Sequence, residues 1–367
     1  MEARSVRILF VAPNIAAPGA NGGSTHVTEV VSHLRERDDV LLIARRGSTL
    51  EQTLALGGPT PAKGIRQLNA ARLAMRALPA VRRFAPEVIY ERGSAFGLGA
   101  MLGRALSVPS LCMVLDEHQT ALSLRSASRL IATREDIVPA AYRHKLSLVR
   151  WGANTHSFRP DLDARELRAL LGIPEQRLVV GYTGAFYAWH GLEDLVRAAE
   201  LLRDLDAVFL LVGVGERSAA VAAQIAAAGL QQRFVLPGRV PYAEVPRYVA
   251  ACDVYAAPYN PARKLGPAGD FIYDPLKLFE AMAGGKPVVT LRAGNIAAMF
   301  QDDRDVVLFE PGNARDLADK LRGLLQDPAR RARIGAAARA TVEQRYSWAA
   351  HTDVLRELFR AMVEEKR

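Results

Sequence analysis

The stretch DPLKLFEAMAGGKPVV, residues 274–289, predicts a short helix that leads directly into a buried strand. Asp274 suits the N-cap, and Pro275 suits the first helical position, where its missing N–H costs nothing. The glycine pair at 284–285 ends the helix, and residues 287–289 begin the strand. A helix followed directly by a buried strand is typical of an α/β protein with a parallel sheet.

Two charged residues stand out on this helix. Lys277 falls in the first turn, where the helix dipole disfavours a cation unless an anion is bound there too. Glu280 shares its face three residues later, among apolar neighbours. The pattern predicts a phosphate held by the N-terminal amides and Lys277, while Glu280 accepts hydrogen bonds from sugar hydroxyls. The alternative is a solvated lysine beside a glutamate in a local salt bridge.

At 367 residues, half of them hydrophobic, the chain exceeds one ordinary core, so two domains are expected. Strand and helix signals alternate throughout, which indicates two doubly wound, Rossmann-like α/β domains that face a central cleft. We expect an N-terminal domain over 1–157, a second over 158–345, and a C-terminal helix over 346–367 that packs back toward the first. The expected strands are 6–12, 40–44, 87–90, 109–115, 129–132, 179–183, 207–213, 233–236, 253–257 and 287–291. The expected helices include 25–37, 161–176, 192–204, 217–228 and 243–251.

The cysteine usage and hydropathy suggest a cytoplasmic protein. Cys112 and Cys252 lack metal-ligand spacing and are expected as buried thiols in a reducing compartment. No run approaches the ~18 apolar residues of a membrane span. The start, residues 6–12, is expected to be the first buried strand rather than a signal sequence.

The net charge of +9 is concentrated in the first half of the chain. Residues 1–150 hold 20 Lys and Arg against 12 Asp and Glu, whereas residues 151–367 hold 28 against 27. The basic half predicts an anionic partner, with peripheral contact at the inner face of a membrane, through a helix that carries arginines at 66–83. The alternative is the solvated face of a helix packed on a sheet. Nucleic acid is not expected, because aromatic residues do not interleave with the basic ones.

With these residues in view, the chain resembles the GT-B glycosyltransferases, specifically the retaining family 4 (group 1), in a variant subgroup with a PLKLFE motif. The resemblance covers nearly the whole chain and rests on the order of several short motifs. They are GGSTH at 22–26, PEVIYER at 86–92, WGAN at 151–154, GYTG at 181–184, WHGL at 189–192, VGVG at 212–215, GRV at 238–240 and the segment 277–287.

The resemblance implies an enzyme that moves a sugar from a nucleotide diphosphate sugar, such as a UDP- or GDP-sugar, to an acceptor with retention at the anomeric carbon. It implies no metal and no further cofactor, because helix N-termini and basic side chains hold the diphosphate. The acceptor, expected on the N-terminal domain, is an unidentified sugar, lipid-linked or small molecule. The leaving phosphate itself is expected to take the acceptor proton.

The resemblance also assigns roles to individual residues. His118, Lys277 and Glu280 are expected at the reacting centre, and Glu117 is a lesser candidate for acceptor contact. Glu280 matches the glutamate that binds ribose hydroxyls, and Gly22 and Gly23 would let the backbone approach the diphosphate. The residues expected to hold the nucleotide sugar are Gly22, Gly23, Gly184, His190, Gly238, Arg239, Val240, Arg263, Lys264, Asp274, Leu276 and Glu280.

The chain departs from the family pattern at several of these positions. Ile272 replaces a motif glutamate, so Asp270 or Asp274 is expected to substitute for it. Ala185 and His190 stand where the family places Arg and Lys against the diphosphate. Lys277, with Arg263 or Lys264, is expected to restore that charge. The segment after His118 is also short, which predicts an acceptor site that is either open or completed by a partner or a membrane.

Three alternatives remain open at this point. The missing glutamate and altered cations are compatible with a sugar-nucleotide-binding protein, catalytically weak or inactive, that acts as a subunit or regulator. An NADP-dependent oxidoreductase could use Arg45 and Arg46 against a 2′-phosphate, but residues 19–23 lack the Gly-x-Gly-x-x-Gly spacing. A sugar-nucleotide epimerase with the same fold is the third.

Overall fold

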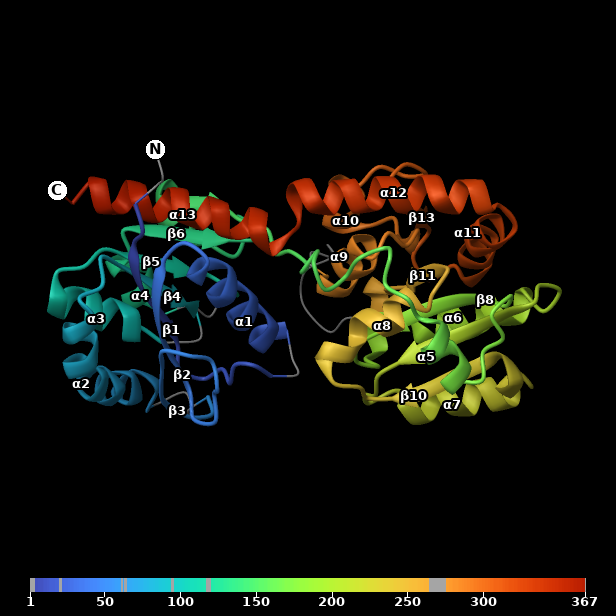
Figure 1. Cartoon of the computed structure of the whole chain (residues 1–367), viewed down its shortest axis with the longest axis horizontal. Coiled ribbons are helices and arrows are strands. Elements are labelled where there is room, and N and C mark those ends of the chain that lie inside the picture. The colour runs from blue at the N-terminus through green and yellow to red at the C-terminus, as the bar shows by residue number, and fades with distance from the viewer. Residues whose placement is uncertain are drawn as a thin grey trace. The chain divides into compact units, whose positions relative to one another are not determined.

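The structure is a computed structural model that describes residues 4–19, 22–60, 62, 65–93, 96–116, 120–263 and 275–366. The chain forms two compact units (Figure 1). The first contains residues 1–151 together with 348–367, and the second contains residues 152–347. Each unit is a parallel sheet flanked by helices, so the fold is of the α/β, Rossmann-like type predicted from the sequence.

The first unit is built on a seven-stranded sheet in the order β3-β2-β1-β4-β5-β6-β7. Its strands run parallel in every pair, with Arg7 opposite Asp39 and Ile8 opposite Val88 in the register of the central strands. The strands are β1 Arg7–Ala12, β2 Asp39–Arg45, β3 Thr53–Gly57, β4 Val88–Arg92, β5 Ser110–Met113, β6 Arg129–Ala132 and β7 Leu146–Leu148. The helices are α1 Gly22–Arg35, α2 Arg66–Phe84, α3 Leu98–Leu106, α4 Ala121–Ser126, η3 Ala140–Lys145 and α13 Trp348–Glu364.

The C-terminal helix α13 belongs to the first unit, although the chain reaches it only after completing the second. It packs on α1, as the red and blue helices of Figure 1 show. Arg356 of α13 donates to Asp38 Oδ2 at 3.0 Å, and both side chains are buried. The first unit is therefore completed by residues from both ends of the chain.

The second unit is built on a six-stranded sheet in the order β10-β9-β8-β11-β12-β13, again parallel throughout. The strands are β8 Leu178–Thr183, β9 Ala207–Val212, β10 Phe234–Gly238, β11 Val254–Ala257, β12 Val288–Leu291 and β13 Val307–Phe309. The α-helices are α5 Arg165–Leu170, α6 Leu192–Leu201, α7 Ser218–Ala227, α8 Val245–Ala250, α9 Leu276–Ala283, α10 Gly294–Met299, α11 Ala314–Gln326 and α12 Pro328–Arg345. Short 3-10 helices are η4 Ala188–His190, η5 Gln231–Arg233, η6 Tyr242–Glu244 and η7 Pro261–Arg263.

Packing follows the apolar patterns of the sequence. In the first unit, Leu9, Val11 and Ile43 of the sheet form one core cluster with Leu73 and Val81 of α2. Both cysteines are buried free thiols, as predicted. No helix among the described residues is long and apolar enough to cross a membrane.

Candidate active site

Glycine-rich turns line the carboxyl edge of the second sheet. Gly184, Gly213 and Gly238 lie at the ends of β8, β9 and β10 with φ of +132°, +134° and +81°, the region that favours glycine. Gly184 N–H donates to the Val212 carbonyl at 2.9 Å, and Gly213 N–H donates to the Gly238 carbonyl at 2.8 Å. A Cβ at position 213 would lie 2.0 Å from the Gly184 carbonyl oxygen, so the turns stack too closely for any side chain.

Helix α9 reaches this edge with its first turn. It begins at Leu276, and Pro275 occupies the N-cap position in an extended conformation without a side-chain cap. The prediction of Pro275 as the first helical residue was therefore wrong by one position, because its φ of −84° and ψ of 99° lie outside the helical region. The predicted end was right, since Gly284 is the C-cap and Gly285 follows with φ of +68°.

Lys277 extends from this first turn into a cluster of aromatic side chains. Its Nζ donates to Tyr182 Oη at 2.8 Å and lies 3.5 Å from His190 Nδ1. It also lies 4.5 Å and 5.7 Å from the ring centroids of Tyr182 and Tyr259. We call Lys277, Tyr182, His190 and Tyr259 the lysine cluster. A Cβ at Gly184 would lie 2.6 Å from Lys277 Nζ, so glycine is needed where β8 ends.

Burial dominates the electrostatics of the lysine cluster. It lowers the pKa of Lys277 to about 7, because the charged amine loses its water, while the nearby Glu280 carboxylate acts in the opposite direction. The pKa of His190 is lowered to about 3, first by burial and then by the positive charge of Lys277. His190 is therefore neutral at physiological pH, and its buried Nε2 has no hydrogen-bond partner among the described residues.

Glu280 does not pair with Lys277, although both lie on α9. Its side chain is 6 % exposed and accepts a hydrogen bond from Tyr242 Oη at 2.7 Å. The described residues hold no ion pair to Lys277, so the solvated lysine and local salt bridge considered as an alternative are not what the structure contains. The helix instead presents a partly buried amine and a buried carboxylate to different partners.

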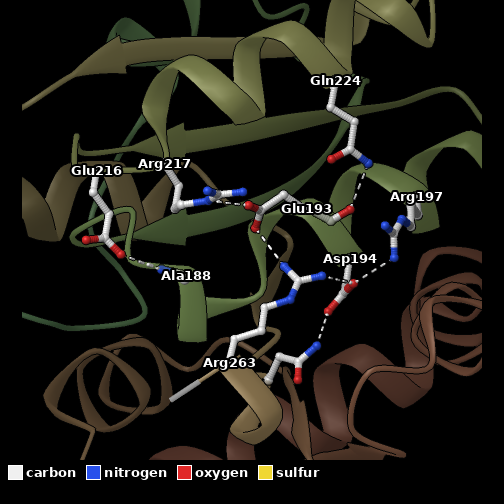
Figure 2. A network of polar contacts seen from close by, with 9 residues as sticks. Ala188, Glu193, Asp194, Arg197, Glu216, Arg217, Gln224 and Arg263 are labelled. Atoms are coloured by element: carbon white, nitrogen blue, oxygen red, sulfur yellow. Dashed lines mark hydrogen bonds and ion pairs between the residues drawn. The ribbon is translucent and has the colours of Figure 1, made fainter. Parts of the chain in front are cut away.

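Arg263 lies in a second polar network, which Figure 2 shows at close range. Its guanidinium donates to Glu193 Oε2 at 2.9 Å and to Asp194 Oδ1 at 3.0 Å. Arg217 also donates to Glu193 at 2.7 Å, and Asn260 Nδ2 donates to Asp194 at 2.7 Å. We call these five residues the paired-charge cluster. The predicted contact of Arg263 with a diphosphate would compete with two existing ion pairs.

The paired-charge cluster follows from where α6 begins. Glu193 and Asp194 occupy the first turn of α6, where the helix dipole favours carboxylates. Both are nearly buried, at 6 % and 1 % exposure, so they require cationic partners. Arg263, which ends η7, supplies the charge that ties the segment after β11 to the start of α6.

The remaining predicted residues are distributed as follows. Gly238 ends β10, and it is followed by Arg239, which is exposed, and Val240, which is partly exposed. Gly22 and Gly23 are the first two residues of α1 in the first unit, where first-turn amides lack intrahelical acceptors. Several residues lie outside the described part of the chain, and nothing is stated of their structure: Glu117, His118, Lys264, Asp270, Ile272 and Asp274.

Tyrosines are the site residues that sequence reasoning missed. Tyr182 and Tyr242 make the direct contacts to Lys277 and Glu280. For Tyr182 a signal was present, because it is the penultimate residue of β8, directly before the Thr183-Gly184 turn. Tyr242 lies beyond the end of β10 and meets Glu280 across 38 positions of sequence, which no local pattern indicates.

Part of the second unit matches a known protein family. Residues 177–327 match the model of the family described as glycosyl transferases group 1. They span the lysine cluster, the paired-charge cluster and all the glycine turns of the second sheet.

Two curated relatives illustrate the sequence similarity. The 2-deoxystreptamine glucosyltransferase of Streptomyces kanamyceticus is 31 % identical over 170 residues, which cover 46 % of this chain and 41 % of the relative. The GDP-mannose-dependent monoacylated alpha-(1-6)-phosphatidylinositol monomannoside mannosyltransferase of Corynebacterium glutamicum is 26 % identical over 307 residues, which cover 76 % of this chain and 79 % of the relative. The matched regions span less than half the length of the first four curated relatives.

Among solved structures, HepE of Anabaena, crystallised in complex with UDP, superposes with a TM-score of 0.76 at 22 % identity. The match covers 97 % of this chain and 100 % of HepE. A likeness at this identity shows the fold, and the chain therefore has the GT-B architecture of two Rossmann-like units. The same Anabaena protein has also been crystallised with UDP-glucose.

Proposed function

We propose that this protein is a retaining glycosyltransferase that moves a sugar from a nucleotide diphosphate sugar to an acceptor without a metal ion. The observation that carries the proposal is that Lys277 and Glu280 both lie on α9, whose first turn reaches the glycine-lined edge of the second sheet. The amine is suited to a phosphate and the carboxylate to ribose hydroxyls. The group 1 family match over the same residues supports this assignment.

The second unit is proposed to hold the donor. Its tight turns at Gly184 and Gly213 place no side chain at the edge of the sheet, which suits a close approach by a diphosphate. The gain in catalysis would come from holding the leaving diphosphate while charge develops on it. In the front-face route, that phosphate takes the acceptor proton, and the protein supplies geometry and charge.

The base of the donor is proposed to be uracil or guanine. Complexes of HepE contain UDP and UDP-glucose, and the Corynebacterium relative is GDP-mannose-dependent. The backbone at Gly238, Arg239 and Val240 is the proposed contact to the base. The first unit is proposed to bind the acceptor, and His118 is proposed to lie near the donor sugar and the acceptor. Gly22 and Gly23 are proposed to let the backbone approach the diphosphate.

A thermal-shift panel tests the donor assignment. A ligand that binds only the folded protein raises the melting temperature, by an amount that grows with its concentration relative to its Kd. UDP, GDP and their sugar conjugates are expected to raise it, whereas NADP is not. An NMR assay of the anomeric configuration of the product, or of the sugar released by slow donor hydrolysis, then tests retention. A product of inverted configuration would refute the retaining mechanism.

A non-catalytic binding protein is the second candidate. It is favoured by the occupation of Arg263 in two ion pairs, which reduces the free positive charge for a leaving diphosphate. This candidate predicts a thermal shift with the nucleotide sugar but no release of free sugar over long incubation. If the wild-type protein hydrolyses the donor and Glu280→Gln does not, the non-catalytic candidate is excluded.

We also propose peripheral contact of the first unit with an anionic membrane through α2. This helix contains five arginines and no acidic residue. Arg72, Arg76, Arg82 and Arg83 are exposed and form no ion pair with any described residue. Leu68 and Met75 are 53 % and 68 % exposed on the same helix. Exposed arginines with interspersed apolar side chains suit the surface of anionic lipid.

A further inference from the structure

Lys277 is a partly buried lysine whose amine contacts neutral side chains. Its Nζ donates to Tyr182 Oη, lies near His190 Nδ1, and faces the rings of Tyr182 and Tyr259. None of the carboxylates in the described part of the chain forms an ion pair with it, and Glu280 one turn later accepts from Tyr242 instead. Within the described ranges, an ammonium ion at this position therefore has no carboxylate in contact to offset its partial loss of water.

We propose that Lys277, whose amine contacts a phenol and an imidazole and no described carboxylate, binds the diphosphate as a proton-coupled site that takes up a proton from solvent when the phosphate binds. The coupling rests on the proposed nucleotide-diphosphate function. The proton transfer balances, because one proton from solvent becomes the third N–H of the Lys277 ammonium group and no other bond is formed or broken. The phosphate of the ligand supplies a negative charge next to Lys277, which the described contacts of its amine do not provide.

The groups that face Lys277 explain why the amine, and not the imidazole, is the group that titrates. Burial lowers the pKa of Lys277 to about 7, although Glu280 on the same helix and the two ring faces favour the charged form. From β8 and η4, Tyr182 and His190 contribute a phenol and an imidazole, and the segment after β11 contributes the Tyr259 phenol. The pKa of His190 is lowered to about 3, so His190 stays neutral throughout the range in which Lys277 changes charge.

The direction in which pH changes the affinity for diphosphate follows from the linkage between proton binding and ligand binding. A bound diphosphate raises the pKa of Lys277, so the complex holds more protons than the free protein above about pH 7. Affinity is therefore expected to fall as pH rises above about 7, by up to about tenfold per pH unit, and to be independent of this group below that pH. A site with a permanently charged cation would show no such fall.

Tyr182 is assigned as the positioning residue of this site. Its Oη accepts from Lys277 and donates to the Ala185 carbonyl at 2.7 Å, which fixes the amine beside Gly184. Tyr182→Phe keeps the ring but removes the acceptor oxygen, so it disfavours the charged amine of the free protein. We expect the midpoint of the pH profile to move to lower pH, a change that a purely structural role would not produce.

Calorimetry measures the proton directly. UDP and GDP are titrated between about pH 7.5 and pH 9, above the phosphate pKa of about 6, in buffers of different ionisation enthalpy. The wild-type protein is expected to take up a substantial fraction of one proton, approaching about one at the higher pH. Uridine and guanosine, which lack phosphate, should bind without uptake.

Variants separate Lys277 from its neighbours. Lys277→Arg, which stays charged, and Lys277→Met, which stays neutral, are both expected to bind with no proton uptake at this site, the first more tightly than the second. His190→Gln should retain the uptake. Lys286→Met is the matched control, because Lys286 is another partly buried lysine of the second unit, and its Nζ donates to the Ala250 carbonyl at 2.9 Å.

Two results would overturn the coupling. One is equal proton uptake by the wild-type protein and Lys277→Arg, and the other is an affinity that stays constant from about pH 7 to pH 9 in the wild-type protein. In either case the diphosphate still binds, so the proposed function survives. Absence of binding by both proteins would overturn the proposed function and the coupling with it.

Discussion

The two polar clusters of the second unit handle buried charge in opposite ways. In the paired-charge cluster, Arg263 is shared between two carboxylates of α6, and Arg217 adds a further cation. In the lysine cluster, Lys277 meets a phenol and an imidazole and has no carboxylate partner among the described residues. One cluster satisfies its charges within the protein, whereas the other contains a cation whose proposed counter-charge is the phosphate of a ligand.

This difference distinguishes a structural network from a binding site. Ion pairs that are complete in the free protein hold segments together, and their loss mainly reduces stability. A buried amine without a counter-charge reduces stability in the free protein and is retained when it serves binding or catalysis. The two clusters should therefore respond to mutation with opposite signs in stability.

The largest effect is expected at Arg263. Arg263→Met leaves Glu193 and Asp194 with fewer cations in a buried position, which should lower the free energy of unfolding by about 3 kcal/mol, at the low end for a broken buried pair because the arginine is 28 % exposed. Chemical denaturation measures this loss. Arg197→Met is the control, since Arg197 reaches Asp194 at 3.4 Å from a side chain that is 57 % exposed. Equal losses in the two variants would contradict a structural role specific to Arg263.

A smaller effect, on binding, is expected at Glu280. Glu280→Gln removes a charged acceptor for ribose hydroxyls, which should weaken nucleoside diphosphate binding by about 1.5–3 kcal/mol, or about 10- to 100-fold in Kd. Isothermal titration with UDP and GDP measures it. Glu310→Gln, a change at an exposed carboxylate of the same unit, should leave Kd unchanged. An unaltered Kd in Glu280→Gln would remove the ribose assignment.

Lys277 should show the opposite sign in stability from Arg263. Lys277→Met replaces a buried amine by an apolar side chain, so the ligand-free protein should gain on the order of 1 kcal/mol at neutral pH. The unfolded state binds the lysine proton up to about pH 10.4, whereas the folded state loses it near 7. Wild-type stability should therefore rise with pH across this window relative to Lys277→Met. Thermal melts at several pH values test this, and a destabilised variant would count against a strained amine.

The smallest effect is expected on the surface of the first unit. Arg72→Gln should weaken binding to anionic vesicles by about 1 kcal/mol at low salt, because one unpaired arginine is removed from α2. Cosedimentation with anionic and neutral vesicles measures it. Arg315→Gln, a change at an exposed position of the second unit, should have no effect. Equal binding to neutral and anionic vesicles by the wild-type protein would refute the membrane proposal.

Most of the fold could be predicted because buried parallel strands are continuous apolar runs. All ten predicted strands were confirmed, with ends within a few residues of those observed. The three strands that were missed, β3, β7 and β13, are edge strands of three to five residues. An edge strand has a neighbour on one side only, so a short segment with a weak apolar pattern can complete the sheet.

The candidate site was predicted in part. Lys277 and Glu280 were found because charges inside an apolar helix conflict with burial and with the helix dipole, and such a conflict is visible in the sequence. The N-cap was misplaced by one residue, because Pro275 has an extended and not a helical backbone conformation. Arg263 was expected to be available to a diphosphate, since nothing near it in sequence indicates that Glu193 and Asp194 lie against it.

The amino-acid sequence by itself determined the alternation of strands and helices, the glycine turns and the charged pair on α9, because each depends on residues within a few positions of one another. Only the tertiary structure decided which charges are neutralised. Lys277 meets Tyr182 across 95 positions, and Arg263 meets Glu193 across 70. Whether a cation contacts a carboxylate or a phenol depends on which distant strands and helices lie side by side in the fold. This difference in contacts distinguishes the proposed ligand site from the structural network around Arg263.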